Sequence, residues 1–330
     1  MSVAELEARQ VALESPTGGL WRDAWRRLRR NPAAIVGFVL VGTFVVVAVF
    51  APLIAPYNAR EPNLLALAQA GGCCPGPSWH HLFGLDQLGR DEFSRIVWGA
   101  RDSLIVGLVA VSVGLSAGLV IGAIAGYAGG FVDSLLMRCM DIMLAIPGLL
   151  MAIGIVAALG PGLWQIMVAV GVVNVPIFAR LLRGSVLAQK ENDFVLAARS
   201  IGVPRRKILV SHIIPNAIAP VIVQGTLAMA TAIIDVAGLG FLGLGASDPS
   251  TPEWGTMLTD VERYFQSAIQ LAIFPGVAIV LSVLGFNLIG DGLREALDPK
   301  LRGRTERYRE RRPFWWLLGL RKRGAAHGAQ

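Results

Sequence analysis

Six long apolar stretches constrain the fold of this 330-residue chain more than any other feature, and they cover 34–55, 103–126, 134–160, 163–182, 216–245 and 269–290. A transmembrane α-helix needs about 20 consecutive apolar residues, and each stretch meets that length. The strands of an outer-membrane barrel alternate apolar and polar residues, which these stretches do not do. Charged residues make up 16% of the chain, against about 25% in soluble domains. The sequence therefore predicts an all-α integral membrane protein with six transmembrane helices.

The basic residues are divided unevenly between the segments that would lie on the two sides of a membrane. Most of the 30 Lys and Arg residues fall in 1–33, 180–212 and 291–330. The segments 56–102 and 246–268 contain five, which are Arg60, Arg90, Arg95, Arg101 and Arg263. Because cytoplasmic loops of membrane proteins are enriched in Lys and Arg, the sequence predicts that both termini are cytoplasmic.

This topology divides the chain into five regions. They are a cytoplasmic tail at 1–33, a first transmembrane helix at 34–55, an external loop at 56–102, a core at 103–300 with five transmembrane helices and a cytoplasmic loop at 183–215, and a basic cytoplasmic tail at 301–330. In the first tail, Trp21, Trp25 and Leu28 share one face of a helix and arginines occupy the other. That pattern is typical of a helix lying on the membrane surface, and a solvated basic tail is the alternative.

Small residues and prolines mark contacts and bends inside the spans. Gly114, Gly118, Gly122 and Gly126 recur every four residues, a spacing that lets two helix backbones approach closely. Before them, the apolar residues between 93 and 104 recur at helical spacing and predict an amphipathic helix leading into the second span. Pro147 and Pro176 each remove a backbone hydrogen bond, so both are predicted to kink their spans.

Few ionisable or polar groups lie within the apolar stretches, and such groups are functional candidates because they are costly in lipid. Arg138 and Asp141 are one helical turn apart and are interpreted as a local ion pair. Asp235 has no obvious partner nearby and is predicted to face the bundle interior or a water-filled path. The candidates for a translocation path are Asp141, Asn174 and Asp235.

Signals for catalysis or metal binding are missing. The chain has no Gly-Lys dipeptide and so no P-loop for ATP, and its four histidines include no His-Glu-x-x-His pair. The adjacent Cys73 and Cys74 are compatible with an ordinary turn, a vicinal disulfide or a metal ligand pair, of which we favour the turn. With Cys139 they make an odd count without the spacing of a zinc site. We predict no catalytic residue, no metal site and no cofactor bound by this chain.

The cytoplasmic loop between the fourth and fifth spans carries the most specific pattern. Ala197 and Ala198 give a short helix a face of small residues that fits a groove, and Gly202 then breaks the helix. A basic run, Arg205 to Lys207, leads into a second amphipathic piece that ends at Pro215. A helix–turn–helix outside the bilayer suits docking onto a cytosolic partner, and a basic anchoring loop is the alternative.

The same loop resembles the Glu-Ala-Ala motif of ABC importer permeases. Ala197, Ala198, Gly202 and Pro215 fall on the motif's spacing. The chain departs from the motif at Leu196, which takes the place of the glutamate, and at His212, which takes an apolar position. The resemblance implies that the loop docks the ATPase subunits, with coupling residues Ala197, Ala198, Gly202, Ile208, His212 and Pro215.

Further motifs, in order along 20–303, resemble permeases of the dipeptide/oligopeptide/nickel importer family, and the long loop after the first span resembles the second, C-type permease of the pair. They lie at 84–91, 99–101, 125–130, 241–245, 254–258 and 290–299. The resemblance implies a type I (MetI-like) permease fold in a bacterial inner membrane. It also implies a second permease subunit, two cytosolic ATPase subunits that bind ATP and magnesium, an external solute-binding protein and membrane lipids as partners, with no nucleic acid.

The cargo and the energy source leave alternatives open. The resemblance ranks di- or oligopeptides first, with nickel chelates, glutathione and other peptide-like solutes as alternatives. An ion-coupled secondary transporter is the rival class. It is disfavoured because such carriers usually need more buried carboxylates or matched broken helices than this sequence offers.

Overall fold

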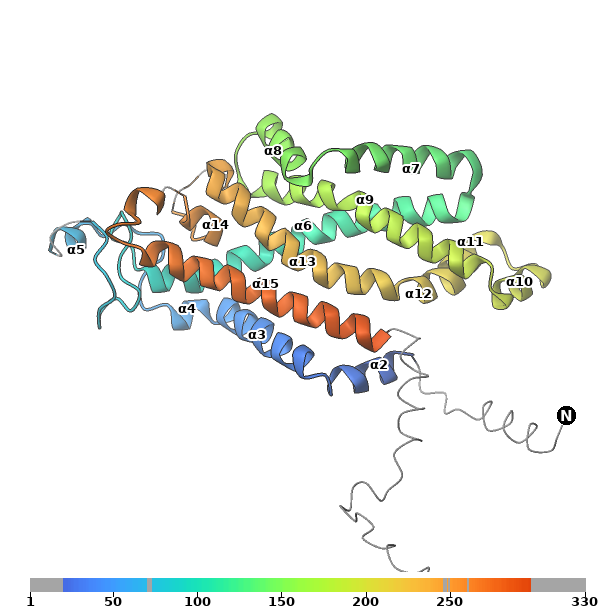
Figure 1. Cartoon of the computed structure of the whole chain (residues 1–330), viewed down its shortest axis with the longest axis horizontal. Helices are drawn as coiled ribbons and strands as arrows, with labels where there is room; N and C mark the ends of the chain where they lie inside the picture. Colours follow the sequence, from blue (N-terminus) through green and yellow to red (C-terminus); the bar gives the residue numbers. More distant parts are fainter. Residues whose placement is uncertain (1–19, 70–72, 246–247, 249, 260, 298–330) are drawn as a thin grey trace, which may run out of the picture.

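The chain is a bundle of long helices with short helices at both ends (Figure 1). The computed structural model describes residues 20–69, 73–245, 248, 250–259 and 261–297, and within these ranges there is no β-strand. The elements are α2 (Leu20–Leu28), α3 (Pro32–Val49), α4 (Ala51–Ile54), α5 (Leu64–Gln69), α6 (Glu92–Ala128), α7 (Gly130–Ala145), α8 (Gly148–Leu159), α9 (Leu163–Lys190), α10 (Asp193–Ser200), α11 (Arg205–Ile208), η1 (Leu209–Ile213), α12 (Ile214–Ala217), α13 (Ala219–Leu239), η2 (Gly240–Leu244), α14 (Trp254–Met257), η3 (Val261–Tyr264) and α15 (Gln270–Leu297). The all-helical prediction is confirmed for the described residues.

Five segments are long and apolar enough to cross a membrane unbroken: α3, α6, α9, α13 with η2, and α15. The predicted span at 134–160 is instead two helices, α7 and α8, that meet at an angle of 92°. The break falls at Ile146, whose backbone is extended, because a following proline disfavours the helical conformation. The six predicted spans are therefore five unbroken helices and one broken pair, with the bend at the predicted Pro147.

The predicted amphipathic segment and the second span form one continuous helix, α6, of 37 residues. Asp91 caps its first turn, where its Oδ2 accepts a hydrogen bond of 2.8 Å from the Ser94 amide. At the other end Gly129 and Gly130 both adopt positive φ, 67° and 56°, which glycine does without steric cost. The chain consequently turns directly from α6 into α7.

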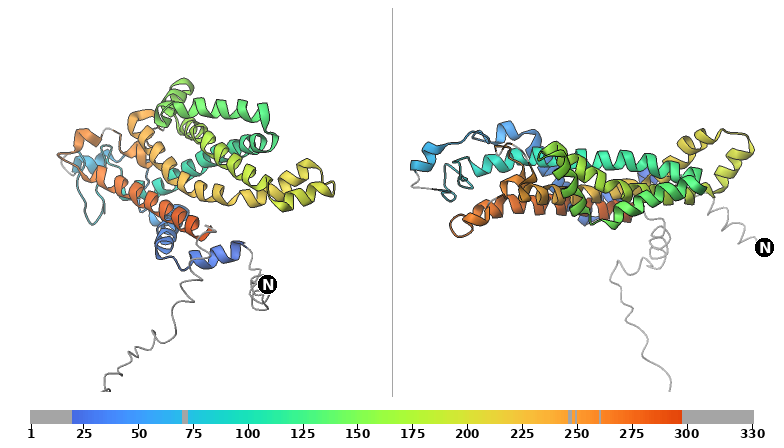
Figure 2. Two further views of the ribbon diagram at one scale, coloured as in Figure 1. Left: turned by 45° about the vertical axis from the view of Figure 1, so that its right-hand side comes forward. Right: turned by 90° about the horizontal axis from the view of Figure 1, so that it is seen from above.

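The bundle is built around the contact between α6 and α9 (Figures 1 and 2). On one side of this pair α13, α15 and α3 follow in turn, and on the other side α7 and α8 pack against α9. The central apolar cluster joins buried side chains of α6, α8, α9, α13 and the segment 195–217, among them Val106, Phe178 and Leu182. The segment with the helix–turn–helix pattern is thus continuous with the core of the bundle.

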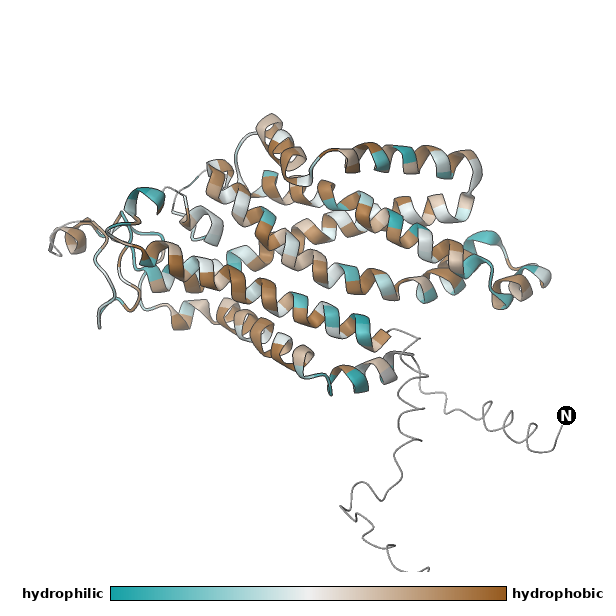
Figure 3. Ribbon diagram, viewed as in Figure 1, coloured by the Kyte–Doolittle hydropathy of each residue, from teal (hydrophilic) through white to brown (hydrophobic). Residues whose placement is uncertain are grey.

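The two ends of the bundle differ in what they carry. α10, α11 and α2 lie at one end, and α5 and α14 lie at the other, with the apolar helix surfaces between them (Figure 3). α2 buries Ala24 and Leu28 against Leu293 and Leu297 of α15, while Trp25 stays half exposed. The predicted surface helix therefore also packs on the protein. The tail at 301–330 lies outside the described residues.

Thiol labelling tests which end faces the cytoplasm. Single cysteines are introduced at the exposed Ser78 and Ser200, in a chain whose three native cysteines are replaced by serine. We expect an impermeant maleimide to label Ser78→Cys in intact cells and Ser200→Cys only after the cells are permeabilised, because the loop around Ser200 is the basic one. The reverse pattern would invert the topology.

Candidate coupling surface and outer polar cluster

The helix–turn–helix pattern is present in the structure as α10, a turn and α11. α10 ends at Ser200, and the amides of Gly202 and Val203 then donate to the carbonyls of Arg199 and Ala198, at 3.0 and 3.1 Å. Gly202 has a φ of 77°, and a Cβ at this position would meet no atom within 4 Å. The turn consequently needs glycine for its backbone conformation and not for space.

The inner face of α10 belongs to the core of the chain itself. Val195, Ala198, Ile208 and Ile213 are all buried in the central cluster. Ala198 is 6% exposed, which corrects the expectation that it shares a docking face with Ala197. The reason is helical spacing: positions 195 and 198 point to the core together, so Ala197, one residue before Ala198, points away from it.

The outer face of α10 and its turn is apolar and exposed. Ile201 is 80% exposed and Leu196 is 51% exposed, and Phe194 and Ala197 are also exposed. We call these four residues the docking patch. Clustered exposed apolar side chains on an otherwise polar end mark a contact with another molecule. Leu196, at the position of the motif's glutamate, adds to this apolar surface.

The other predicted coupling residues lie behind the docking patch or beyond it. Ile208 is fully buried, and Pro215 is exposed in the first turn of α12. His212 is half-buried in η1, and its Nδ1 is enclosed without a hydrogen-bond partner among the described residues. Ile208 supports the segment from the core side, and none of the three residues belongs to the docking patch.

The predicted ion pair between Arg138 and Asp141 is wrong, because Asp141 pairs with Arg180 of α9. A second carboxylate of α7, Asp133, accepts two hydrogen bonds from Arg183, at 2.5 and 2.7 Å. The two ion pairs fasten α7 to α9, beyond the bend at Pro147. Sequence spacing favoured a partner on the same helix, whereas the arginines that pair with Asp141 and Asp133 lie about 40 and 50 residues away in the chain.

The other two path candidates lie in different surroundings. Asn174 is 4% exposed, and its Nδ2 donates to the Val170 carbonyl of its own helix at 2.8 Å. It packs against Gly114, inside the contact between α6 and α9. Asp235 is half-buried on α13 and makes no hydrogen bond or ion pair with another described residue. Asp235 therefore remains a polar group in an apolar span without a partner in the part of the chain that the structure describes.

All four predicted packing glycines of α6 face α9. A Cβ at Gly114 would lie 2.7 Å from the Gly171 carbonyl oxygen, and one at Gly118 would lie 2.5 Å from the Phe178 Cβ. At Gly122 the nearest atom is the Ala179 carbonyl oxygen, also at 2.5 Å. Gly126 likewise meets Arg183 and Val186 at 3.0 Å. The row lets the two backbones touch within this one chain.

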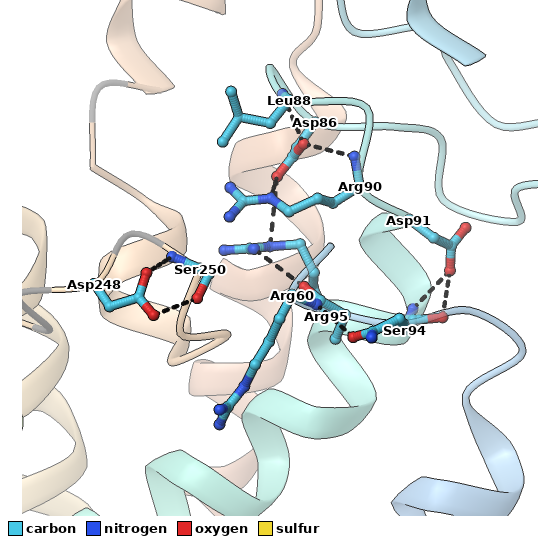
Figure 4. Close-up of polar contacts among 11 residues, drawn as sticks. Arg60, Asp86, Leu88, Arg90, Asp91, Ser94, Arg95, Asp248 and Ser250 are labelled. Carbon is cyan, nitrogen blue, oxygen red and sulfur yellow. Dashed lines mark hydrogen bonds and ion pairs between the residues drawn. The ribbon is translucent and has the colours of Figure 1, made fainter. Parts of the chain in front are cut away.

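The opposite end of the bundle holds a buried cluster of charged residues that the sequence analysis did not find (Figure 4). Asp86 accepts hydrogen bonds from the amides of Leu88 and Arg90 at 2.9 Å, and from the Arg90 Nε at 2.6 Å. The Arg95 Nε lies 3.6 Å from the same carboxylate. Both arginine side chains point toward the segment that holds Asp248 (Figure 4). The signal for this cluster was the motif at 84–91.

Glu253 fixes the second part of this outer end. Its carboxylate accepts from the amides of Gly255 and Thr256 at 2.9 and 2.7 Å and thereby caps α14. It also lies 3.4 Å from the Ser103 hydroxyl of α6. Burial raises the pKa of Glu253, whereas the Ser250 hydroxyl and amide hold the pKa of the exposed Asp248 below its usual range. A cavity of about 380 Å³ lies between the charged cluster, η2 and α14.

The features that could indicate an enzyme or a metal site have structural roles. Cys73 and Cys74 form a vicinal disulfide, which corrects the interpretation of this stretch as an ordinary turn, and Cys139 is free and exposed. No three His, Cys, Asp or Glu side chains of the described residues gather in a way that could hold a metal. One catalytic signal in the sequence was overlooked, because Gly114–Gly118 matches the Gly-x-Ser-x-Gly pattern of hydrolases. Ser116, however, lies in the middle of α6, where its hydroxyl donates to the Ser112 carbonyl, and not on a strand-to-helix turn.

Comparison with known proteins agrees with this architecture. Residues 118–303 match the family described as binding-protein-dependent transport system inner membrane component, and residues 19–70 match the N-terminal TM domain of oligopeptide transport permease C. The dipeptide transport system permease protein DppC of Alkalihalophilus pseudofirmus is 50% identical over 282 residues, covering 86% of this chain and 90% of the relative. The glutathione transport system permease protein GsiD of Shigella flexneri is 48% identical over 283 residues, covering 86% and 91%.

A solved structure shares the fold at lower similarity. A chain of the MetNI methionine ABC transporter in an inward-facing conformation aligns with a TM-score of 0.51 and 19% identity, over 62% of this chain and 96% of that one. Together with the family match, the helical bundle with an exposed helix–turn–helix at its basic end defines the class, which is the membrane-spanning permease of an importer. The chain belongs to the family of binding-protein-dependent transport system inner membrane components, and within it to the C-type permeases. The resemblance seen in the sequence is confirmed, as is the multi-pass location in a bacterial inner membrane.

Proposed function

We propose that this permease carries di- or oligopeptides across the membrane, along a path that it forms with a second, related permease. Two cytosolic ATPase subunits supply the energy, and an external solute-binding protein delivers the cargo. The support for the cargo is the 50% identity to a relative named as a dipeptide permease, over 86% of the chain.

The exposed docking patch is the observation that carries the coupling role. It places four apolar side chains on a helix–turn–helix that is packed into the core through Val195, Ala198 and Ile208. A movement of a partner bound to the patch is therefore transmitted to α9 and α13, which share that core. The chain itself hydrolyses nothing and binds no cofactor, since ATP and magnesium bind to the ATPase subunits.

Asp235 is the strongest candidate for the path among the three residues that the sequence singles out. It is half-buried in a span and has no partner in the described chain, so a polar cargo or water meets it without breaking an ion pair. Asp141 contributes through its pair with Arg180, which positions α7. Asn174 is held between α6 and α9 and is left out of the proposed path.

Glutathione is the second candidate cargo, because a relative named as a glutathione permease is 48% identical over the same share of the chain. Nothing in the structure favours a nickel chelate. An ion-coupled carrier working alone is also unsupported, because the family is that of a binding-protein-dependent system.

Uptake by the complete importer tests the cargo. Proteoliposomes that contain both permeases and the ATPase subunits, with the binding protein outside and ATP inside, are given a radiolabelled dipeptide or glutathione. We expect ATP-dependent uptake of the dipeptide at a rate at least about tenfold above that of glutathione. Faster glutathione uptake would replace the cargo assignment with the second candidate, while transport without ATPase subunits would contradict the coupling.

A further inference from the structure

A pocket lies at the basic end of the bundle, between the ends of two spans and the base of the coupling segment. Its volume is about 450 Å³. It is lined by Tyr127 and Ala128 at the end of α6, Lys190 at the end of α9, Arg199 of α10, Val203, and Arg205 and Ile208 of α11. In Figure 1 these helix ends meet beside α10 and α11.

The charged residues lining the pocket are all cations. Lys190, Arg199 and Arg205 line it without any carboxylate, and none of them forms an ion pair with a described residue. The Lys190 ammonium is already positioned, since it donates to the Tyr127 carbonyl at 3.2 Å and lies 5.8 Å from the Tyr127 ring centroid. The Asp133 carboxylate is engaged by two hydrogen bonds from Arg183. Three converging cations repel one another, and an anion in the pocket relieves that repulsion.

The position of the pocket relative to the spans points to the source of the anion. Tyr127 is the second-last residue of α6, at the end of an apolar span, where tyrosine side chains reach the headgroup level. Just after the turn at Gly129 and Gly130, Phe131 is 79% exposed. A phosphate in the pocket would therefore have an apolar surface beside it that suits an acyl chain.

We propose that Lys190, Arg199 and Arg205 bind the phosphate of an anionic phospholipid from the cytoplasmic leaflet. Basic pockets between transmembrane helices on the cytoplasmic side are suited to such headgroups. Arg199 and Arg205 flank the turn at Gly202, so one phosphate holds α10 and α11 to the ends of α6 and α9. The consequence of this contact for coupling to the ATPase subunits rests on the proposed function, whereas the binding of the lipid does not.

Lipid retention by the assembled importer tests the site. The complex is placed in nanodiscs of phosphatidylcholine with phosphatidylglycerol, and tightly bound phosphatidylglycerol is counted by native mass spectrometry. The test variant is Lys190→Gln/Arg205→Gln. The matched control is Arg206→Gln/Lys207→Gln, which removes the same charge from exposed residues of the same segment that do not line the pocket.

We expect the test variant to bind phosphatidylglycerol roughly 25-fold more weakly, at roughly fivefold for each of the two cations removed, and the control to match the wild type. The single variants Lys190→Gln and Arg205→Gln, with roughly fivefold each, keep the test decisive if the double variant does not assemble. Equal phosphatidylglycerol retention in the test and control variants would overturn the site.

A second arm separates lipid from free phosphate. Inorganic phosphate is titrated by calorimetry into the complex in nanodiscs of phosphatidylcholine alone. We expect no saturable binding in the millimolar range. Saturable phosphate binding that the test variant loses, without specific phosphatidylglycerol retention, would overturn the lipid assignment. If uptake fails while lipid retention follows the prediction, the proposed function is contradicted and the lipid site is not.

Discussion

Replacing Gly118 with leucine is expected to separate α6 from α9 and to prevent the chain from folding into a stable bundle. A Cβ at this position would lie 2.5 Å from the Phe178 Cβ and 2.8 Å from the Val175 carbonyl oxygen, and Phe178 is fully buried. The backbone oxygen cannot move without displacing α9, so the two helices must part along the whole glycine row. Overpacking of a core by a few methylenes costs about 1–3 kcal/mol. Leucine at position 118 is expected to cost more, because its side chain would press against the backbone of α9.

The yield of monodisperse protein and its melting temperature in detergent measure this effect. Gly118→Ala should lower the melting temperature, and Gly118→Leu should leave little folded protein. Gly42→Leu is the matched control, because Gly42 is exposed on α3 and a Cβ there meets no atom within 4 Å. If Gly118→Leu behaved like Gly42→Leu, the row would not be a packing surface.

The parts of the fold that the sequence predicted are those set by local chemistry. A span is recognisable because about 20 apolar residues must be continuous in the chain. The bend at Pro147 follows from a proline that disfavours the helical conformation of the residue before it, and the glycine row follows from a four-residue spacing. The turn at Gly202 was predictable for the same kind of reason, because glycine is the residue that most readily adopts the positive φ found there.

The parts that could not be predicted depend on which helices become neighbours. Asp141 pairs with Arg180 because α7 folds back on α9 at the 92° bend, and no local pattern shows this. Ala197 and Ala198 look equivalent in the sequence, but only the packing of α10 on the bundle decides which is buried. The pairing of Asp86 with Arg90 is local, whereas its contact with Arg95 and the fixed position of α14 through Glu253 are tertiary.

The difference between Ala197 and Ala198 provides the test of coupling. Ala197 is exposed in the docking patch, so Ala197→Glu leaves the fold of the chain intact and places an unpaired charge where the ATPase subunits would bury it. Burying an unpaired charge is strongly unfavourable, and we expect the ATPase subunits to be lost from the purified complex. Ala198→Glu would bury its charge in the core of the chain itself, and a lowered melting temperature distinguishes that effect.

Gly202→Leu should uncouple the importer by a different route. The left-handed conformation costs an L-residue about 1–2 kcal/mol, and no neighbouring atom blocks the side chain, so the expected effect is a changed angle between α10 and α11. The ATPase subunits should then bind weakly or remain unstimulated by the loaded binding protein. Ala188→Glu is the matched control for the charge that Ala197→Glu introduces, because Ala188 is exposed near the end of α9 and lies outside the docking patch. Arg206→Ala should be mild, since an exposed charge contributes little.

Copurification of the ATPase subunits and stimulation of ATP hydrolysis are measured together in the reconstituted importer, with uptake as the final readout. Loss in Ala197→Glu with retention in Ala188→Glu assigns the contact to the docking patch and not to the overall charge of the basic end of the bundle. Loss of stimulation in Gly202→Leu with a normal melting temperature assigns the transmission of movement to the turn. Normal copurification, stimulation and uptake in both Ala197→Glu and Gly202→Leu would remove the segment from the coupling mechanism, because its one exposed apolar face and its only positive-φ residue would both be dispensable.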